Sequence, residues 1–174
     1  MRVIAGEFRS RRLKTLQGLD TRPTPDRLRE ALFSILAPEI EDTIFIDAYA
    51  GTGAVGIEAL SRGAARSIFI ERSKAAAGVI RENLASLGLH RRAEILVGRV
   101  LQHLGKLRGD IVFLDPPYSL QDEYSQALAI LGENPPGLAI AQHSSRLLLS
   151  DEYGSLRRTR VLRQGDNALS VYRP

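Results

Sequence analysis

The sequence of 174 residues contains no cysteine. The chain therefore has no disulfide, no thiolate nucleophile and no cysteine ligand for a metal ion. Its three histidines, His90, His103 and His143, do not have the spacing of metal ligands. We expect them to be structural or solvated, and we expect no bound metal. The motifs of Ser-His-Asp hydrolases and of phosphate-loop NTPases are also lacking.

Long apolar runs are missing as well. No run approaches the roughly 20 residues needed to cross a bilayer, and the first residues lack the apolar stretch of a signal peptide. We therefore expect a cytoplasmic protein that does not contact membranes. The apolar fraction of 44% and the charged fraction of 25% are typical of globular proteins. The length suits one domain, residues 1–174, and we expect a monomer.

The net charge of +4 is unevenly distributed along the chain. Residues 1–29 carry eight basic and three acidic groups, a net charge of +5, whereas the remainder carries 16 basic and 17 acidic groups. A basic extension on a nearly neutral body is typical of a protein that holds nucleic acid at one edge. The alternative is a solvated surface rich in arginine. The basic residues are Arg2, Arg9, Arg11, Arg12, Lys14, Arg22, Arg27 and Arg29.

The order of apolar segments predicts the fold class. Two short strands are expected between Arg2 and Lys14, followed by a helix with Thr24 as its cap and Pro25 at its first position. Beyond residue 43, short apolar strands alternate with amphipathic helices, which predicts an α/β protein with a parallel sheet covered on both faces. The expected strands are 44–46, 67–70, 94–97, 110–114 and 137–142, and the expected helices are 55–61, 74–87, 100–107 and 123–131. The turn at 165–167 predicts a final antiparallel hairpin.

A glycine-rich loop, Asp47-Ala-Tyr-Ala-Gly-Thr-Gly53, follows the first of these strands. In a wound sheet this is the carboxyl edge, where ligands bind. Gly51 and Gly53 allow a sharp turn and a close approach to a ligand. The loop is also similar to a dinucleotide fingerprint, because Gly56 follows Gly53 by three residues. The acid at position 47 favours S-adenosylmethionine, whose ammonium group lies where a dinucleotide has pyrophosphate.

The next two strand ends carry opposite charges. Glu71 ends the second strand, where a carboxylate can accept hydrogen bonds from both ribose hydroxyls of an adenosine. The third strand is followed by Arg99 and Val100, at a place where adenosine-binding folds often have an acid. Arg99 could lie along the adenine face, or backbone amides of residues 98–100 could hold the adenine.

The second motif, Asp115-Pro116-Pro117-Tyr118, directly follows the apolar strand that ends at Leu114. The Asp115 carboxylate and the Pro116 carbonyl can accept the two hydrogen bonds of an exocyclic amine, which positions a poorly nucleophilic nitrogen for attack. The prolines fix the backbone, and the Tyr118 ring offers a surface for a flipped base. Together with the glycine loop at the same edge, this motif predicts transfer of a methyl group to an amine.

The segments just described, with Met1 to Gly6, Arg22 to Glu30 and Glu71-Arg72, resemble the bacterial RsmD-type methyltransferases over nearly the whole chain. The resemblance implies a Rossmann-like, seven-stranded class I methyltransferase sheet with a short N-terminal β-hairpin/helix extension. It implies transfer of methyl from S-adenosylmethionine to the N2 amine of a guanine in small-subunit ribosomal RNA, as naked RNA or in the assembled subunit.

The same resemblance implies roles for individual residues. The Asp115 to Tyr118 motif would hold the guanine as the catalytic group. The cofactor would be bound by Asp47, Tyr49, Ala50, Gly51, Thr52, Gly53, Glu71, Arg72, Arg99 and Val100. The RNA would be bound by Arg2, Arg9, Arg11, Arg12, Lys14, Arg22, Thr24 and Arg27. Arg99 departs from the family pattern, which usually has an acid there, and Gln142 stands where relatives often carry Glu.

Three other functions compete with this one. A DNA adenine-N6 methyltransferase would use the same tetrapeptide, but such enzymes commonly add a target-recognition domain. A dinucleotide-dependent oxidoreductase would explain the glycines but would leave Asp115 to Tyr118 without a role. A non-catalytic RNA-binding module on the same fold is the third alternative.

Overall fold

The computed structural model describes residues 1–16 and 25–174. It has one eight-stranded sheet in the order β3-β2-β1-β4-β5-β8-β7-β6. Strands β1 to β5 are parallel, and β8, β7 and β6 continue the sheet in antiparallel fashion. The strands are β1 (Ile44–Asp47), β2 (Arg66–Glu71), β3 (Ala93–Val97), β4 (Ile111–Leu114), β5 (Leu138–Ser144), β6 (Glu152–Tyr153), β7 (Leu156–Gln164) and β8 (Asn167–Arg173). This confirms the predicted α/β class I methyltransferase fold, with the two-residue β6 added at the edge.

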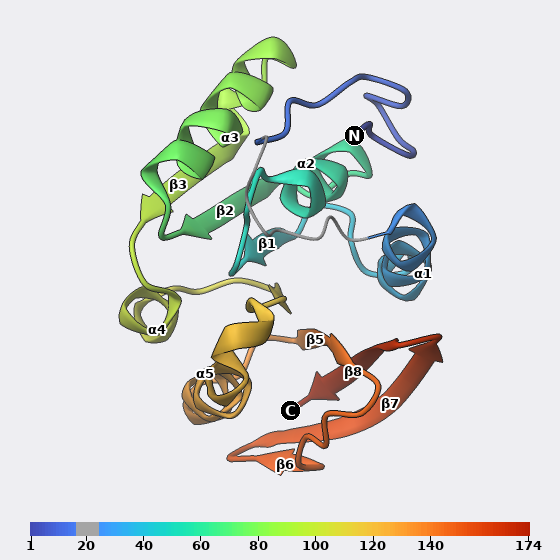
Figure 1. The fold of residues 1–174 in the computed structure, drawn as a ribbon, viewed down its shortest axis with the longest axis vertical. Coiled ribbons are helices and arrows are strands. Elements are labelled where there is room, and N and C mark those ends of the chain that lie inside the picture. Colours follow the sequence, from blue (N-terminus) through green and yellow to red (C-terminus); the bar gives the residue numbers. More distant parts are fainter. Residues whose placement is uncertain (17–24) are drawn as a thin grey trace.

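Helices cover both faces of the sheet (Figure 1). One face carries α1 (Asp26–Leu36), α2 (Ala54–Ser61) and α3 (Lys74–Ser86), and the other carries α4 (Val100–His103) and α5 (Asp122–Glu133). Short 3-10 turns complete the chain at η1 (His90–Arg92), η2 (Leu104–Lys106) and η3 (Tyr118–Leu120). In the described part of the chain, no helix is long and apolar enough to cross a membrane.

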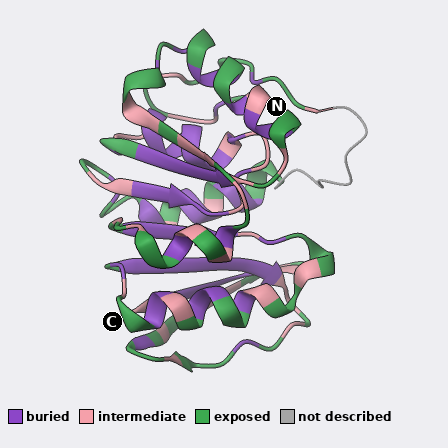
Figure 2. Cartoon of the chain, turned by 90° about the vertical axis from the view of Figure 1, so that its left-hand side faces the viewer, coloured by how far each residue is buried: buried purple, intermediate pink, exposed green. Residues whose placement is uncertain are grey.

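The central strands are apolar along their whole length because side chains of both faces are covered. Phe45, Phe113 and Ile140 pack under α1, whereas Ile46 and Val112 pack under α5. Figure 2 shows the resulting layer of buried residues running through the sheet and along the inner faces of the helices. Apolar burial on both faces fixes the strand ends, and therefore fixes the loops that leave the carboxyl edge.

Most predicted element ends lie within two residues of the observed ones, and two helices differ in a way that has a local cause. Helix α1 begins at Asp26, so Pro25 occupies the capping position instead of the first helical one, and Thr24 lies outside the described residues. The predicted helix 100–107 divides into α4 and η2. Gly105 lies within η2, and the low helix propensity of glycine favours the change to a tighter turn.

The first 16 residues form an arm that packs against α2 and α3. Val3 and Leu13 are buried in the cluster that contains Ile57 and Leu84. The expected pair of short strands is reduced to a single antiparallel bridge between Arg2 and Arg12. The reason is that many backbone groups of the arm bond to the helices instead of to each other.

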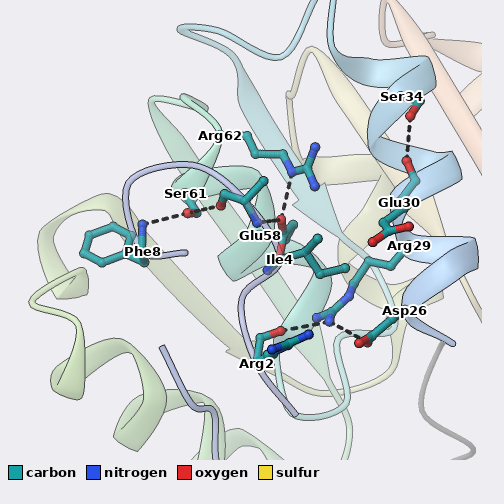
Figure 3. Close-up of polar contacts among 11 residues, drawn as sticks. Arg2, Ile4, Phe8, Asp26, Arg29, Glu30, Ser34, Glu58, Ser61 and Arg62 are labelled. Atoms are coloured by element: carbon teal, nitrogen blue, oxygen red, sulfur yellow. Dashed lines mark hydrogen bonds and ion pairs between the residues drawn. The ribbon is translucent and has the colours of Figure 1, made fainter. Parts of the chain in front are cut away.

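Glu58 of α2 is fully buried and accepts the amides of Ile4 (2.8 Å) and Ala5 (2.9 Å) as well as Arg62 Nε (2.8 Å). Figure 3 shows these contacts together with the bond from the Phe8 amide to Ser61 Oγ. A buried carboxylate is thus satisfied mainly by the arm, which makes the arm an integral part of the fold.

Gly6 lies where the arm crosses the end of α2. Its φ is +82°, and a Cβ there would come within 1.9 Å of the Ser61 carbonyl oxygen. Only glycine combines this left-handed conformation with such a close approach.

Candidate active site

A large cavity of about 1070 Å³ opens at the carboxyl edge of the sheet. Each of the five parallel strands delivers residues to it. The lining includes Asp47, Tyr49, Ala50, Gly51, Thr52, Glu71, Arg72, Arg99, Val100, Asp115, Pro116, Pro117, Tyr118, Gln142 and His143. Two motifs 60 residues apart in the sequence therefore share one pocket, because the carboxyl ends of parallel strands meet at one edge.

The glycine loop turns from β1 into α2. Gly51 and Gly53 both have positive φ, at +56° and +84°, and Gly53 is the N-cap of α2. Gly53 is the one predicted cofactor residue that does not line the cavity; an added Cβ would meet Ile80 at 3.2 Å. At Gly51 a Cβ would meet no atom within 4 Å, so its missing side chain leaves open space.

Asp47 lies buried at the base of this loop. Its Oδ2 accepts the amide of Gly56 at 2.9 Å. Burial raises the pKa of Asp47 to about 7; the Gly56 hydrogen bond opposes this shift, and the charge of Glu71 adds to it. Gly56 is itself required, since an added Cβ would lie 2.3 Å from the Phe69 ring. The cavity thus contains a carboxylate that would gain from a cationic partner.

Glu71 holds the backbone around it. One carboxylate oxygen accepts the amide of Gly51 (2.8 Å), and the other accepts the amide of Ser73 (2.7 Å). Each oxygen has a second lone pair, so the carboxylate can still accept hydroxyl groups. Glu71 therefore links the glycine loop to the start of α3 and also faces the cavity.

Arg99 is exposed at the cavity rim, and its side chain makes no hydrogen bond or ion pair with another described residue. It occupies the N-cap position of α4, where a capping acid is common, but its side chain accepts no hydrogen bond. The neighbouring Val100 is buried. Gly98, just before Arg99, could not carry a side chain without displacing His103, which lies 2.6 Å from the ideal Cβ position.

The second motif forms the opposite wall of the cavity. Asp115 is half-buried and Pro116 is buried, whereas Pro117 and Tyr118 are exposed. Tyr118 is 57% exposed and lines the cavity, so its ring is available to a planar ligand. Gln142 on the neighbouring strand β5 donates from Nε2 to Asp115 Oδ2 at 3.2 Å.

Several cavity residues were not predicted from the sequence. The Tyr124 hydroxyl donates to the Gln142 carbonyl (2.5 Å), so α5 is tied to the strand that supports Asp115. The Tyr49 hydroxyl donates to Glu123 at 2.6 Å and thereby connects the glycine loop to α5. Tyr124 and Glu123 occupy ordinary helix positions, and no pattern in the sequence marks them as neighbours of Gln142 or Tyr49.

His143 is the histidine of the cavity wall. Its Nδ1 lies 2.8 Å from the Ser144 carbonyl and therefore carries the proton, so Nε2 accepts the Ser170 hydroxyl at 2.8 Å. Burial lowers the pKa of His143; the Ser144 carbonyl opposes this shift, and the charges of Arg158 and Arg163 add to it. The neutral ring is fully hydrogen-bonded, as expected for a structural histidine. Among the described residues, no three potential metal ligands gather at one place.

None of the predicted RNA-binding residues that the structure describes lines the cavity, to which the extension contributes Met1, Thr15, Leu16, Pro25 and Asp26. The Arg11 guanidinium donates to the carbonyl of Ser86, the last residue of α3, and Lys14 pairs with Glu82 at 2.7 Å. Helix α3 begins at the carboxyl edge and is 13 residues, or about 20 Å, long. Arg11 is thus at the far end of this helix. Arg2, Arg9, Arg12 and Arg27 are exposed, and Arg22 and Thr24 lie outside the described residues.

Comparisons with known proteins were made for the whole chain. The family described as "Conserved hypothetical protein 95" matches residues 1–173. The "Putative rRNA methyltransferase YlbH" of Bacillus subtilis is 34% identical, over 99% of this chain and 98% of that protein. "Ribosomal RNA small subunit methyltransferase D" of Haemophilus influenzae is 38% identical, over 77% of this chain and 72% of that protein. The structure of the "Putative methyltransferase yhhF" of Escherichia coli is similar with a TM-score of 0.87 and 30% identity, over 99% of this chain and 96% of that one.

Proposed function

The chain belongs to the family described as conserved hypothetical protein 95, the RsmD-type methyltransferases, and we propose that it methylates small-subunit ribosomal RNA. The reaction is transfer of a methyl group from S-adenosylmethionine to the exocyclic N2 amine of a guanine in 16S RNA. The observation that carries this proposal is the shared cavity, in which the glycine loop faces Asp115 to Tyr118.

The donor set of the cavity fits S-adenosylmethionine. Asp47 and Glu71 place two carboxylates beside a loop whose Gly51 leaves open space. Two carboxylates would repel the pyrophosphate of a dinucleotide, whereas they suit an ammonium group and ribose hydroxyls. We assign the ammonium group to Asp47 and the ribose to Glu71, with residues 49–53, Arg72 and Val100 completing the site and Arg99 lying at its rim. When bound, the cofactor supplies an electrophilic methyl group on its sulfonium.

The other wall is assigned to the target base. The Asp115 carboxylate and the Pro116 carbonyl accept the two N–H groups of the amine, which fixes the nitrogen and turns its lone pair toward the cavity. The adjacent prolines restrict the backbone that presents this carbonyl. Gln142 steadies Asp115 through the 3.2 Å hydrogen bond. Tyr118 stacks on the flipped base, a contact worth about 1–3 kcal/mol in single-strand binders.

We infer that residues 1–174 act as one methyltransferase domain, in which residues 1–29 form an RNA-binding extension. The extension adds cations outside the cavity, so it contributes to RNA affinity more than to the chemistry. This division of roles separates residues whose loss lowers the turnover number from residues whose loss weakens RNA binding.

Methyl transfer from labelled cofactor should be measured with naked small-subunit RNA, assembled small subunits and DNA. We expect label in RNA, recovered as N2-methylguanosine at one nucleotide mapped by primer extension. The Asp115→Ala variant should lose turnover while its cofactor affinity, measured by calorimetry, barely changes. Label in DNA adenine would support the adenine-N6 alternative, and cofactor binding without any transfer would leave only the non-catalytic one.

A further inference from the structure

The C-terminal hairpin carries a charge that the proposed site does not use. Residues 156–173 contain five arginines and one acid, Asp166. At the amino edge of the sheet these arginines are paired: Arg157 with Glu152, and Arg173 with Glu39. Arg158, near that end, pairs with Asp151. The paired arginines are neutralised by neighbouring carboxylates, so they contribute little to the field outside the protein.

The tip of the hairpin lies at the opposite edge, beside the cavity. Asn167 pairs with Ser144 at the carboxyl end of β5, and Ser145 donates to the Asp166 carbonyl at 2.9 Å. Asn167 also lines the cavity, next to Gln142 and His143. The turn between β7 and β8 is therefore part of the rim on the side assigned to the target base.

Two arginines at this tip have no carboxylate partner among the described residues. They are Arg163, near the end of β7, and Arg146, just after β5, and both are exposed. In the register of the sheet, Arg163 pairs with Ala168, which in turn pairs with His143. Residues that are paired across neighbouring strands face the same side of a sheet, so these three lie on the face that carries the cavity residue His143. Burial is the main cause of the lowered pKa of His143, and the charges of Arg158 and Arg163 add to it.

Two cations of the N-terminal arm are held away from this rim. Arg11 is fixed at the end of α3, about a helix length from the carboxyl edge, and Lys14 is paired with Glu82. An RNA whose target base enters the cavity has phosphates immediately beside that base. Cations at the rim are needed to hold those phosphates, and on the Asp115 side the described structure offers Arg146 and Arg163.

We propose that the tip of the β7–β8 hairpin, with Arg146 and Arg163, is a docking surface for the RNA phosphates that flank the target nucleotide. This inference rests on the proposed function, because it takes the RNA to be the molecule whose base enters the cavity. Arginine suits this role because its guanidinium makes two parallel hydrogen bonds to one phosphate. Asp166 at the turn offsets part of the charge but leaves the tip net positive.

A plainer role for the arginines is protection of the sheet edge. Strand β6 pairs only with Leu156 and Arg157, so the outer side of β7 beyond them has no partner strand in the described structure. Positive charges on such an edge discourage pairing with another chain. Edge protection predicts that loss of charge changes self-association and leaves RNA binding unaffected.

The test compares two double variants of the same net charge. Arg146→Gln with Arg163→Gln removes the tip cations, and Arg157→Gln with Arg173→Gln removes the same number at the other end of the hairpin, about 20 Å away along the strand. Binding of small-subunit ribosomal RNA is measured over a range of salt. Each single-strand phosphate contact contributes about 0.7 to the slope of log affinity against log salt, so the tip variant should lose about 1.4. Relative to its affinity at 1 M salt, the tip variant should therefore bind RNA roughly 25-fold more weakly than the native protein at 0.1 M salt.

The control variant should change the slope far less than the tip variant does. Lysine at positions 146 and 163, in place of arginine, should keep most of the native slope. Cofactor affinity and thermal unfolding should match the native protein in both double variants. Equal slopes for the tip and control variants would overturn the inference, even if methylation proceeds. If the tip variant loses RNA affinity but the native protein methylates no RNA, the docking surface stands and the proposed function fails.

The location can be tested separately because the chain has no cysteine. Asp166→Cys and Arg157→Cys each introduce one attachment point for an iron chelate that cleaves nearby RNA. Cleavage from position 166 should cluster around the methylated nucleotide, and cleavage from position 157 should not. Cleavage from position 166 at sites remote from that nucleotide would contradict the proposed docking surface.

Discussion

Replacement of Glu58 by alanine should release the N-terminal arm. The carboxylate is fully buried and accepts the Ile4 and Ala5 amides and Arg62 Nε. Arg62 keeps about a fifth of its side chain exposed, so it can regain water, whereas the two amides lose their acceptors. Hydrogen bonds to charged groups contribute about 1.5–3 kcal/mol each, so at the lower end of this range Glu58→Ala should cost about 3 kcal/mol of unfolding free energy from the two amides alone.

The expected loss can be measured in two ways. For a chain of this size, 1 kcal/mol shifts the melting temperature by about 2–4 °C, so the variant should melt roughly 6–12 °C lower. Hydrogen exchange should show faster exchange of the Ile4 and Ala5 amides than of amides in β1 or β4. Glu58→Gln keeps one acceptor oxygen and should lose less.

Glu94→Ala is the matched control. Glu94 pairs with Arg66 at 3.6 Å, and both side chains are about half exposed, so its loss should cost under about 1 kcal/mol. The reasoning would be refuted if Glu58→Ala melted with the control and kept the Ile4 and Ala5 amides protected. Such a result would mean that burial of Val3 and Leu13 alone holds the arm in place.

Three further predictions concern charge. Because its folded pKa, about 7, lies above the unfolded value of 3.8, Asp47 contributes stability below about pH 4 that is lost as the pH rises to 7. The stability of Asp47→Asn relative to the native protein, measured by urea unfolding, should therefore be higher at pH 8 than at pH 5. An equal difference in stability at the two pH values would refute the assigned pKa. Arg99→Asp should leave cofactor affinity equal or improved, and a large loss in calorimetry would show that Arg99 binds the cofactor directly. Neutralising Arg9, Arg11 and Arg12 together should reduce the salt dependence of RNA binding and leave the turnover number unchanged. An unaltered slope of log affinity against log salt would mean that these arginines do not contact RNA phosphates.

The location of the cavity was predictable because it depends on topology. Asp47, Glu71 and Asp115 each follow an apolar strand, and the strands are parallel, so their carboxyl ends had to meet. The side chain of Gln142 was not predictable in the same way. Its bond to Asp115 requires that β5 lie next to β4 and that the register between the two strands be correct to one residue. Neither requirement is encoded in the local sequence.

The arm shows the limit of reasoning from composition. Its arginines predicted a polyanion surface, and that role remains a prediction. Nothing in the composition indicated that Glu58 and Ser61 would take the backbone amides, or that the arm would run to the end of α2 remote from the cavity. Long-range hydrogen bonds of this kind follow from packing and have no periodic signature.

Asn83 connects the N-terminal arm to the glycine loop of the cavity. Its Oδ1 accepts the Lys14 amide (2.7 Å), and its Nδ2 donates to the carbonyls of Lys14 (3.1 Å) and Thr52 (3.2 Å). One buried amide group therefore serves both the arm and the glycine loop. Lifting the arm would remove two of the three hydrogen bonds that orient this amide, and so would loosen the loop. By linkage, whatever favours the docked arm also favours an ordered loop, and the free energy of that coupling is the same in both directions.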